Sequence, residues 1–468
     1  MIERFEGDKV IWMIVLLLMM FSVLSVFSST SLLAQQTSTD RLSIVKEQIF
    51  IVAAGLVVIG ICYVIRNIKV FEWFSKWGFA VSFALLVMLV ANVHLGSLVR
   101  AAEINGARRI LFMMGLQIHV YEIVKVAMVM YLAWAVNALK EEDYRNTNGE
   151  SCDKFHIANR LASKYESLSF LAQPIWKKVF YIYVPILLVC ALILKSGTSS
   201  ALFIGGIMVL TIYIGGVNLK EVFALGAAAA LYVGLCFFLY KVSDHKIKLS
   251  DRIVTAAGRM DNSDDQDMEI LKAMPRNSLE FQEALDNLKQ PVSALIAIKE
   301  GGILGKGPGR STQRYIVPVI FGDYMFSFIV EEYGWWGALI IMILYASLIA
   351  RGSLLAKNCE NYFAKVALAG LIMMISAQAF MHIAINVHLV PQTGQTLPLI
   401  SHGASSFLAF SLAFGLILSM SRMIHKRMVK AMEAADPILV HTEGADDVRD
   451  GLSQLEDMED GNYLDEEM

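Results

Sequence analysis

The feature that most constrains this chain is the recurrence of long apolar runs. About ten segments approach the roughly 20 residues that a helix needs to cross the hydrocarbon core of a bilayer. They cover residues 10–32, 48–66, 78–97, 120–138, 177–194, 199–216, 222–240, 323–350, 363–386 and 404–424. Helices are expected because unpaired backbone groups are too costly in hydrocarbon, and the alternating pattern of membrane-barrel strands is absent. The sequence therefore predicts an all-α, polytopic membrane protein with about ten transmembrane helices.

The composition agrees with that class. Hydrophobic residues make up 56% of the 468 residues, which is more apolar side chain than a soluble domain of this size can bury. The charged residues, 18% of the chain, lie mainly between the apolar runs. The five cysteines show neither a disulfide framework nor a metal-ligand spacing.

The formal net charge of −3 combines two parts of opposite sign. Residues 431–468 hold 13 Asp or Glu and one Arg, which leaves 39 basic and 30 acidic residues in the remainder. A basic body suits a protein that works against anionic lipid head groups, although basic loops are also ordinary in membrane proteins. We expect residues 1–430 to form one membrane domain. Residues 431–468 should form a disordered acidic tail, which is either a docking segment or only a solubilising one.

Loop charge sets the expected orientation. With the N-terminus in the cytoplasm, the short cytoplasmic loops carry about 15 Lys or Arg and the short external loops about six, as the positive-inside rule requires. Both termini are therefore expected in the cytoplasm. Residues 241–322, between the seventh and eighth runs, then form one large extracytoplasmic loop that should carry the site. The first run follows Lys9 and is interpreted as a retained anchor rather than a cleaved signal.

Three sequence blocks suggest a family. The first is Gly301-Gly-Ile-Leu-Gly-Lys-Gly-Pro-Gly-Arg-Ser-Thr-Gln-Arg314, followed by Pro318 and Gly322-Asp-Tyr-Met-Phe-Ser-Phe-Ile-Val-Glu-Glu-Tyr-Gly334. The second is Asn386-Val-His-Leu-Val-Pro-Gln-Thr-Gly-Gln-Thr-Leu-Pro-Leu-Ile-Ser-His-Gly-Ala-Ser-Ser406, and a weaker third combines Asn105-Gly-Ala-Arg-Arg109 with Glu122-Ile-Val-Lys125. With these blocks the chain resembles the peptidoglycan glycosyltransferases of the shape, elongation, division and sporulation (SEDS) family.

The resemblance covers most of the chain, apart from the N-terminal anchor and the acidic tail. The Gly-Lys-Gly-Pro-Gly-Arg-Ser form is more similar to the branch that serves division than to the branch that serves elongation. Three departures stand out: the stretch from Lys195 to Ser200 lacks the usual Pro-Asp or Pro-Glu pair, Ile110 replaces a Trp, and His402-Gly-Ala404 replaces a Tyr-Gly-Gly turn. The first of these departures puts an acidic contribution from the loop at Lys195 to Ser200 in doubt.

The resemblance implies that Asp323 is the general base. Sugar transfer from a lipid-linked donor removes a proton from the acceptor hydroxyl while a diphosphate leaves, so it needs a carboxylate and nearby cations. The alternative role for Asp323 is to cap the following helix. By the same resemblance Arg109 and Lys125 hold the diphosphate, Arg109 through its planar fork. Glu122 and Lys125, three residues apart, can equally form a structural pair on one helix.

Further candidates lie in the other motif blocks. The glycine-rich run is not a Walker loop, because its Lys precedes the glycines, so ATP binding is not expected. That run either lines a groove for an anionic glycan or diphosphate, or forms a structural turn. Glu331 and Glu332, inside an apolar run, either join the site or bond between helices. The substrate-binding candidates in these blocks are Lys306, Gln313, Arg314, Ser401 and His402.

The function implied by the resemblance is polymerisation of lipid II, with undecaprenyl diphosphate as the leaving group. No dedicated cofactor is expected; a divalent cation, Mg or Mn, can accompany the substrate diphosphate. The expected partners are a class B penicillin-binding transpeptidase and other divisome proteins in the bacterial inner membrane, with no nucleic acid. The alternatives are a flippase for the lipid-linked precursor, suggested by the many spans and intramembrane charges, and an inactive division scaffold.

Overall fold

The computed structural model describes residues 6–29, 41–95, 99–104, 107–113, 116–148, 154–195, 197–242, 279–317, 320–390 and 393–435. The helices in chain order are α1 (Lys9–Ser29), α3 (Arg41–Val64), α4 (Ile68–Val90), α5 (Val120–Thr147), α6 (His156–Lys164), α7 (Pro174–Lys178), α8 (Val184–Leu194), α9 (Thr198–Ile214), α10 (Leu219–Val242), α13 (Leu279–Gly301), α14 (Met325–Lys357), α15 (Tyr362–Asn386) and α16 (Ala404–Ala435). Three short helices are η2 (Glu166–Ala172), η3 (Val179–Tyr183) and η4 (Gln313–Tyr315).

The predicted polytopic helical fold is confirmed. Within the described residues, eight helices are long and apolar enough to cross a membrane, and α9 is a shorter apolar helix. Each of the ten predicted runs overlaps a helix, with α10 at the seventh run and with α7, η3 and α8 together forming the fifth. The predicted tail lies outside the described residues except for its first five, because α16 continues to Ala435.

The third predicted run was misplaced along the chain. Its helix, α4, begins at Ile68, because the side chain of Asn67 accepts a 3.0 Å hydrogen bond from the Lys69 amide and caps it. Lys69 and Glu72 in its first turns lower the local hydropathy, which hid this start in the sequence. The helix ends at Val90, so the end of the predicted run has another structure.

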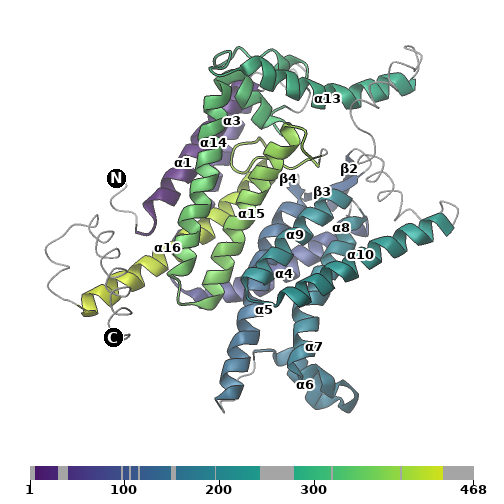
Figure 1. The fold of residues 1–468 in the computed structure, drawn as a ribbon, viewed down its shortest axis with the longest axis vertical. Helices are drawn as coiled ribbons and strands as arrows, with labels where there is room; N and C mark the ends of the chain where they lie inside the picture. Colours follow the sequence, from purple (N-terminus) through teal and green to yellow (C-terminus); the bar gives the residue numbers. More distant parts are fainter. Residues whose placement is uncertain are drawn as a thin grey trace, which may run out of the picture.

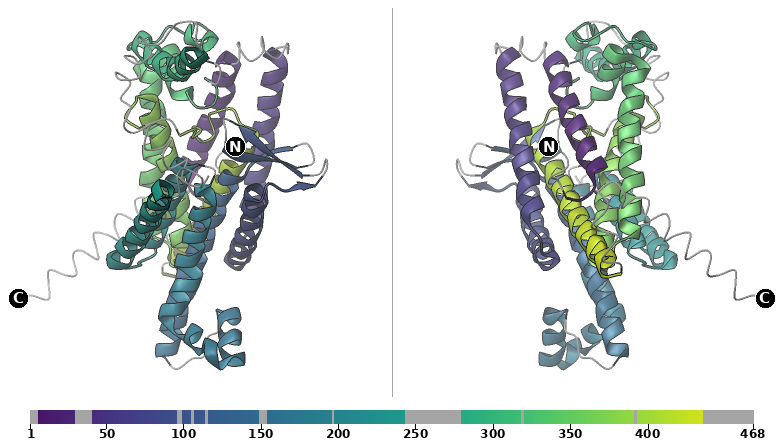
Figure 2. Two further views of the ribbon diagram at one scale, coloured as in Figure 1. Left: turned by 90° about the vertical axis from the view of Figure 1, so that its right-hand side faces the viewer. Right: turned by 90° about the vertical axis from the view of Figure 1, so that its left-hand side faces the viewer.

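That other structure is a small antiparallel sheet. Strands β1 (His94–Leu95), β2 (Val99–Ile104), β3 (Ala107–Met113) and β4 (Leu116–His119) pair in sequence order. Figure 2 shows this sheet projecting from the side of the bundle. This sheet was not predicted from the sequence, because four short strands give a much weaker pattern than a membrane-spanning helix.

The core lies where α5, α15 and α16 meet. Helix α15 contacts α5, α9, α14 and α16, and α16 in turn contacts α3 and α5. Figure 1 shows α15 and α16 between a group formed by α1, α3 and α14 and a group formed by α4, α5 and α9. Helix α13 lies at one end of the bundle, and α6 and α7 lie at the opposite end.

Helix α14 is kinked at Gly334, whose φ of 69° and ψ of −169° are not helical. In an unbroken helix the carbonyl oxygens of residues 331 and 332 would accept from the amides four residues later. Here they accept instead from the amides of Lys306 and Gly307, both at 2.9 Å, while the Trp335 amide donates to the Gly302 carbonyl at 3.0 Å. The kink thus seats the glycine-rich motif directly on α14.

Candidate active site

Asp323 lies in the turn that precedes α14, and it is half-buried. Tyr324 occupies the cap position of α14 and makes no side-chain capping bond. Two of the first free amides of the helix are taken by side chains of α15: the Phe326 amide donates to Nε2 of His382 at 3.3 Å, and the Ser327 amide donates to Oδ1 of Asn386 at 2.9 Å. These two amides are therefore capped by α15 rather than by Asp323.

Asn386 also holds the backbone of this turn. Its Nδ2 donates to the carbonyl oxygen of Asp323 at 3.1 Å and to the carbonyl oxygen of His382 at 2.8 Å. Its Oδ1 accepts from both the amide and the hydroxyl of Ser327. Asn386 is fully buried, so each of these bonds is made away from water. The last turn of α15 therefore fixes the position of Asp323.

Ser401 and His402 hold the same turn from a second direction. The Ser401 hydroxyl donates to the carbonyl oxygen of Gly322 at 2.8 Å, and the His402 amide donates to the carbonyl oxygen of Phe321 at 3.0 Å. Both residues were predicted to bind substrate. The structure places them next to Asp323, with these bonds directed to the turn itself.

The His402 ring reaches across to α3. Its Nδ1 lies 2.8 Å from Oε1 of Gln48, and because an amide oxygen only accepts, Nδ1 is the donor. Burial lowers the pKa of His402 below its ordinary value of 6.5, against the opposing charge of Glu47. The ring is consequently neutral at neutral pH.

Lys125 lies in a buried polar cluster on α5. Its Nζ donates to Oε1 of Glu122 at 2.8 Å, to Oε1 of Gln378, and to Oε1 of Gln395 at 3.4 Å. The Lys125 side chain is 2% exposed and that of Glu122 is 13% exposed. All three ammonium protons therefore have a protein acceptor, and the predicted pair with Glu122 is present.

The Lys125 cluster and the Asp323 turn are joined along one face of α15. Gln378, His382 and Asn386 follow at intervals of four residues, which places them on one face of the helix. Nδ1 of His382 lies 2.7 Å from the Gln395 carbonyl oxygen, and Gln395 in turn bonds Lys125. Asn386 opens the second motif block, but the sequence predicted no site role for any of these three residues. Polar side chains at this spacing inside an apolar run are themselves a signal of function.

Arg109 lies in β3, at an irregularity of the sheet. Ala102 pairs with Ile110, whereas Glu103 pairs with Arg108, so Arg109 is the extra residue of a β-bulge. The side chain of Arg109 is outside the described part of the structure. The sheet leads through β4 into α5, and the His119 amide donates to the Ser405 hydroxyl at 2.9 Å.

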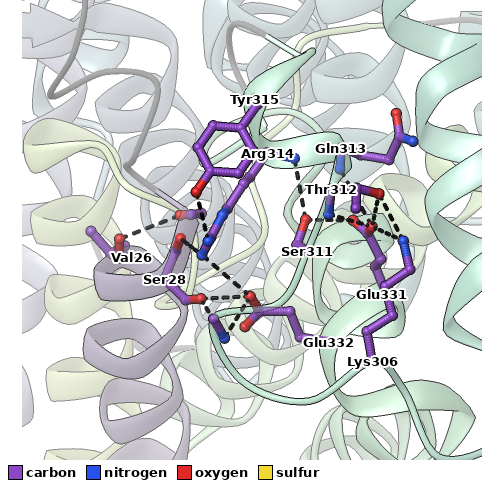
Figure 3. A network of polar contacts seen from close by, with 12 residues as sticks. Val26, Ser28, Lys306, Ser311, Thr312, Gln313, Arg314, Tyr315, Glu331 and Glu332 are labelled. Carbon is purple, nitrogen blue, oxygen red and sulfur yellow. Dashed lines mark hydrogen bonds and ion pairs between the residues drawn. The ribbon is translucent and has the colours of Figure 1, made fainter.

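Glu331 fastens the glycine-rich motif to α14 (Figure 3). Its carboxylate is fully buried and accepts from Nζ of Lys306 at 2.8 Å, from the Thr312 amide at 2.8 Å and from the Ser311 hydroxyl. The Gln313 amide donates to it as well, at 3.3 Å. Lys306 and Gln313 were both predicted to bind substrate. The Lys306 side chain is thus engaged with a carboxylate of the protein, whereas Gln313 bonds that carboxylate through its main-chain amide.

Lys306 also pairs with the exposed carboxylate of Glu300 at the end of α13. Burial acts to lower the pKa of Lys306, but hydrogen bonds and charge from Glu300 and Glu331 outweigh it, so the pKa is raised. The hydrogen bond from Lys306 lowers the pKa of Glu300. This ammonium therefore remains charged over the physiological range and ties α13 to α14.

Glu332 makes the corresponding contacts on the other side of the motif (Figure 3). It accepts from the Ser28 hydroxyl of α1 at 2.6 Å and from the Gly309 amide at 3.0 Å, and Nη1 of Arg314 lies 4.0 Å away. Arg314 itself donates to the Ser28 carbonyl and to the Tyr315 hydroxyl. Both glutamates bond to the loop, and Glu332 also makes an interhelical hydrogen bond, of the kind that the sequence left open, to Ser28 of α1.

No group of three or more His, Cys, Asp or Glu side chains that could hold a metal ion occurs among the residues the structure describes. The arrangement instead presents one half-buried carboxylate, Asp323, on a turn held by α15 and by the 387–403 loop. A buried cation, Lys125, is connected to the backbone of this turn through Gln395, His382 and Asn386. A carboxylate of this kind can accept a proton, and the cation can stabilise negative charge that develops nearby.

Comparison with known proteins gives a consistent result. The model of a cell cycle protein family that takes in FtsW, RodA and SpoVE matches residues 8–426. A probable peptidoglycan glycosyltransferase FtsW of Caulobacter vibrioides is 38% identical over 133 residues, which are 28% of this chain and 34% of that protein. Stage V sporulation protein E of Bacillus subtilis is 24% identical over 425 residues, 90% of this chain and 98% of that protein.

Among solved structures, a chain from a structure titled for the coordination of polymerization and crosslinking by a peptidoglycan synthase complex matches with a TM-score of 0.59. The match has 18% sequence identity and covers 90% of this chain and 98% of the other. At that identity the likeness establishes a shared fold.

Proposed function

This chain belongs to the FtsW, RodA and SpoVE family of cell cycle proteins, and we propose that it is a peptidoglycan glycosyltransferase that polymerises lipid II. The name of the Caulobacter relative, a probable peptidoglycan glycosyltransferase, supports the reaction class. The observation that carries the proposal is the convergence of Asn386 and Ser401 on the turn of Asp323, with bonds of 3.1 Å and 2.8 Å to main-chain carbonyl oxygens. Such support is expected where a carboxylate must be held for chemistry.

The proposed reaction is a single inverting displacement. Asp323 takes the proton of the acceptor hydroxyl, whose oxygen attacks the anomeric carbon of the donor sugar. The new glycosidic bond forms as the bond from that carbon to the diphosphate breaks, and undecaprenyl diphosphate leaves with the electron pair. The α-linked diphosphate becomes a β-1,4 linkage, so one base is sufficient.

The charge of the leaving diphosphate has to be balanced, and we assign this to Lys125 and Arg109. Lys125 contributes its field from a buried position, where a charge acts more strongly than in water. Arg109, at the bulge of β3, suits direct contact with phosphate oxygens. A divalent ion, if one takes part, would draw most of its ligands from the diphosphate.

The proposed setting is the bacterial inner membrane, with both termini in the cytoplasm and the Asp323 turn facing outside. A class B penicillin-binding transpeptidase is the proposed partner, because the structural relative belongs to a complex that couples polymerization to crosslinking. The FtsW name of the Caulobacter relative favours a role in division over one in elongation.

The test separates polymerisation from transport. The full-length protein is reconstituted with its transpeptidase partner in vesicles that carry fluorescent lipid II and a divalent cation. Polymer is resolved on a gel before and after muramidase, and exposure of the fluorophore in each leaflet is followed with a membrane-impermeant quencher. We expect muramidase-sensitive polymer. Translocation without polymer would identify a flippase, and neither activity with the partner present would identify a scaffold.

A further inference from the structure

A large cavity of about 850 Å³ lies at the end of the bundle opposite α13, away from the Asp323 turn. It is lined by the start of α4, the last part of α5, the connection between α14 and α15, and residues 422–427 in the second half of α16. Helix α15 starts at this cavity and ends at Asn386, so the two places are about 36 Å apart along the helix at 1.5 Å per residue. Nothing in the proposed reaction uses it. We call it the basic cavity.

The lining of the basic cavity has an excess of positive charge. Seven Lys or Arg side chains line it against three Glu side chains. Two of these carboxylates are already paired with lining cations: Glu141 with Lys154 at 2.9 Å, and Glu360 with Arg427 at 3.9 Å. Pairing within the cavity therefore leaves most of its cations without a lining carboxylate.

The remaining cations divide into two kinds. Arg422 and Lys426 share the carboxylate of Glu6, at 2.6 Å and 2.9 Å. Arg66 and Lys69 are exposed and make no ion pair with any part of the chain that the structure describes. Lys140 lies over the ring of Tyr362, with Nζ 3.8 Å from the centroid, and it lacks a carboxylate partner within the same described ranges. The third lining carboxylate, Glu72, interacts electrostatically with Lys69 and Lys154. The three cations without an ion pair still outnumber this one carboxylate, which leaves positive charge for an incoming anion.

Two helix N-termini add to this field. Helices α4 and α15 both begin at the cavity, and their capping residues, Asn67 and Asn361, are part of its lining. Each cap satisfies one amide, at 3.0 Å and 2.9 Å. The partial positive charge of a helix N-terminus favours a bound anion, and two such ends beside unpaired cations favour a compact anion with several oxygens.

We propose that the basic cavity binds a phosphate group, carried either by an anionic phospholipid or by a soluble phosphate. The cavity is formed by the ends of four membrane-spanning helices. The ends of such helices lie at the depth of the lipid head groups. Arg66 supplies a guanidinium fork for phosphate oxygens, and Lys69 and Lys140 supply point charges.

The acidic segment that ends the chain is a competing occupant. Residues 436–468 contain 12 Asp or Glu and one Arg. Helix α16, however, continues for eight residues past Arg427, and this carries the chain about 12 Å beyond the cavity before that segment begins. Figure 1 shows this part of α16 projecting from the bundle. The phosphate ligand is therefore the favoured occupant.

The test uses native mass spectrometry of the full-length protein, titrated with cardiolipin or with inorganic pyrophosphate and with phosphatidylcholine as the neutral comparison. We expect Arg66→Gln with Lys69→Gln to weaken binding about tenfold or more, as loss of two charge-assisted contacts predicts. The matched control is Lys289→Gln with Lys299→Gln, which removes two exposed cations of α13 and should leave binding unchanged.

The outcomes separate the two sources. Retention of cardiolipin alone supports a lipid head group, and retention of pyrophosphate supports a soluble phosphate. Equal binding by the two double variants overturns the proposal. Binding that appears only in a chain ending at Ala435 also overturns it, because the acidic segment would then be the occupant in the intact protein.

Discussion

Nδ2 of Asn386 donates a 3.1 Å hydrogen bond to the carbonyl oxygen of Asp323, so the last turn of α15 holds the turn that precedes α14. Asn386→Leu keeps the volume but removes this donor and the acceptor for Ser327. We expect kcat of the polymerisation to fall about 10- to 100-fold with little change in KM, because misplacement by about 1 Å has that effect. Steady-state kinetics with fluorescent lipid II measures both constants.

Ser376→Ala is the matched control for this variant. Ser376 is buried in the same helix, and its hydroxyl has no hydrogen-bond partner among the residues that the structure describes. Its removal should leave both constants unchanged. Equal losses in the two variants would mean that α15 tolerates no change and that Asn386 has no special positioning role.

Lys125 and Glu122 form a pair that can be tested by a double-mutant cycle. Lys125→Met leaves the Glu122 carboxylate without its cation, and the loss of one partner of a buried pair costs about 3 kcal/mol or more. Glu122→Gln in the same chain should recover most of that stability, measured as the midpoint of thermal unfolding. We expect the double variant to remain inactive, because the diphosphate still lacks the cation. Recovery of polymerisation would show that the pair is only structural.

Gly305 and Gly309 allow backbone strain to be separated from steric clash. Both have φ of +77°. A Cβ added to Gly305 would lie 2.3 Å from the Glu332 carbonyl oxygen, whereas a Cβ added to Gly309 would have no atom within 4 Å. Gly309→Ala should cost about 1 kcal/mol for its conformation. Gly305→Ala should cost clearly more, because the loop must leave the kink of α14. Equal shifts in the unfolding midpoint would contradict the close approach of the loop to α14.

We expect His402 to make the stability of the folded protein depend on pH. Its pKa is lowered by burial in the folded protein, so below pH 6.5 the unfolded chain binds a proton that the folded site resists. The folded state should therefore lose stability as the pH falls from 6.5 toward the folded pKa, and this effect should be absent above that range. His402→Gln removes the titration, so the variant should show a smaller decline in unfolding midpoint between pH 7 and pH 5. An unchanged decline would assign the effect to other groups.

The sequence predicted what depends on local composition. Apolar length alone predicted a helix at each of the ten runs, although the third run was displaced along the chain from α4. The i,i+3 spacing of Glu122 and Lys125 predicted their contact, which the structure contains at 2.8 Å. The candidates Asp323, Ser401 and His402 also lie at one turn of the structure. No local sequence pattern predicts this contact, because Asp323 is almost 80 positions from the other two residues.

The rest depended on long-range packing. Glu331 and Glu332 hold the glycine-rich loop because α14 is kinked at Gly334. A regular helical pattern in the sequence does not predict this kink. The sheet at residues 94–119 forms through pairing of short strands, and pairing leaves little trace in hydropathy. The roles of Gln378, His382 and Asn386 depend on the contacts that α14 and Gln395 make with the face of α15 that carries these three residues. Those contacts join segments that are distant in the sequence.

In the proposed reaction the Asp323 carboxylate accepts the proton of the acceptor hydroxyl. Asp323→Asn removes the basic group but keeps the carbonyl oxygen to which Asn386 donates, so the fold should be retained, as an unchanged unfolding midpoint will verify. The decisive measurement is the single-turnover rate of glycan bond formation from lipid II by wild type and Asp323→Asn with the transpeptidase partner. We expect the Asp323→Asn rate to be lower by about 10²- to 10⁴-fold, the contribution of a general base. A folded Asp323→Asn protein that forms polymer at the wild-type rate would contradict the proposed reaction.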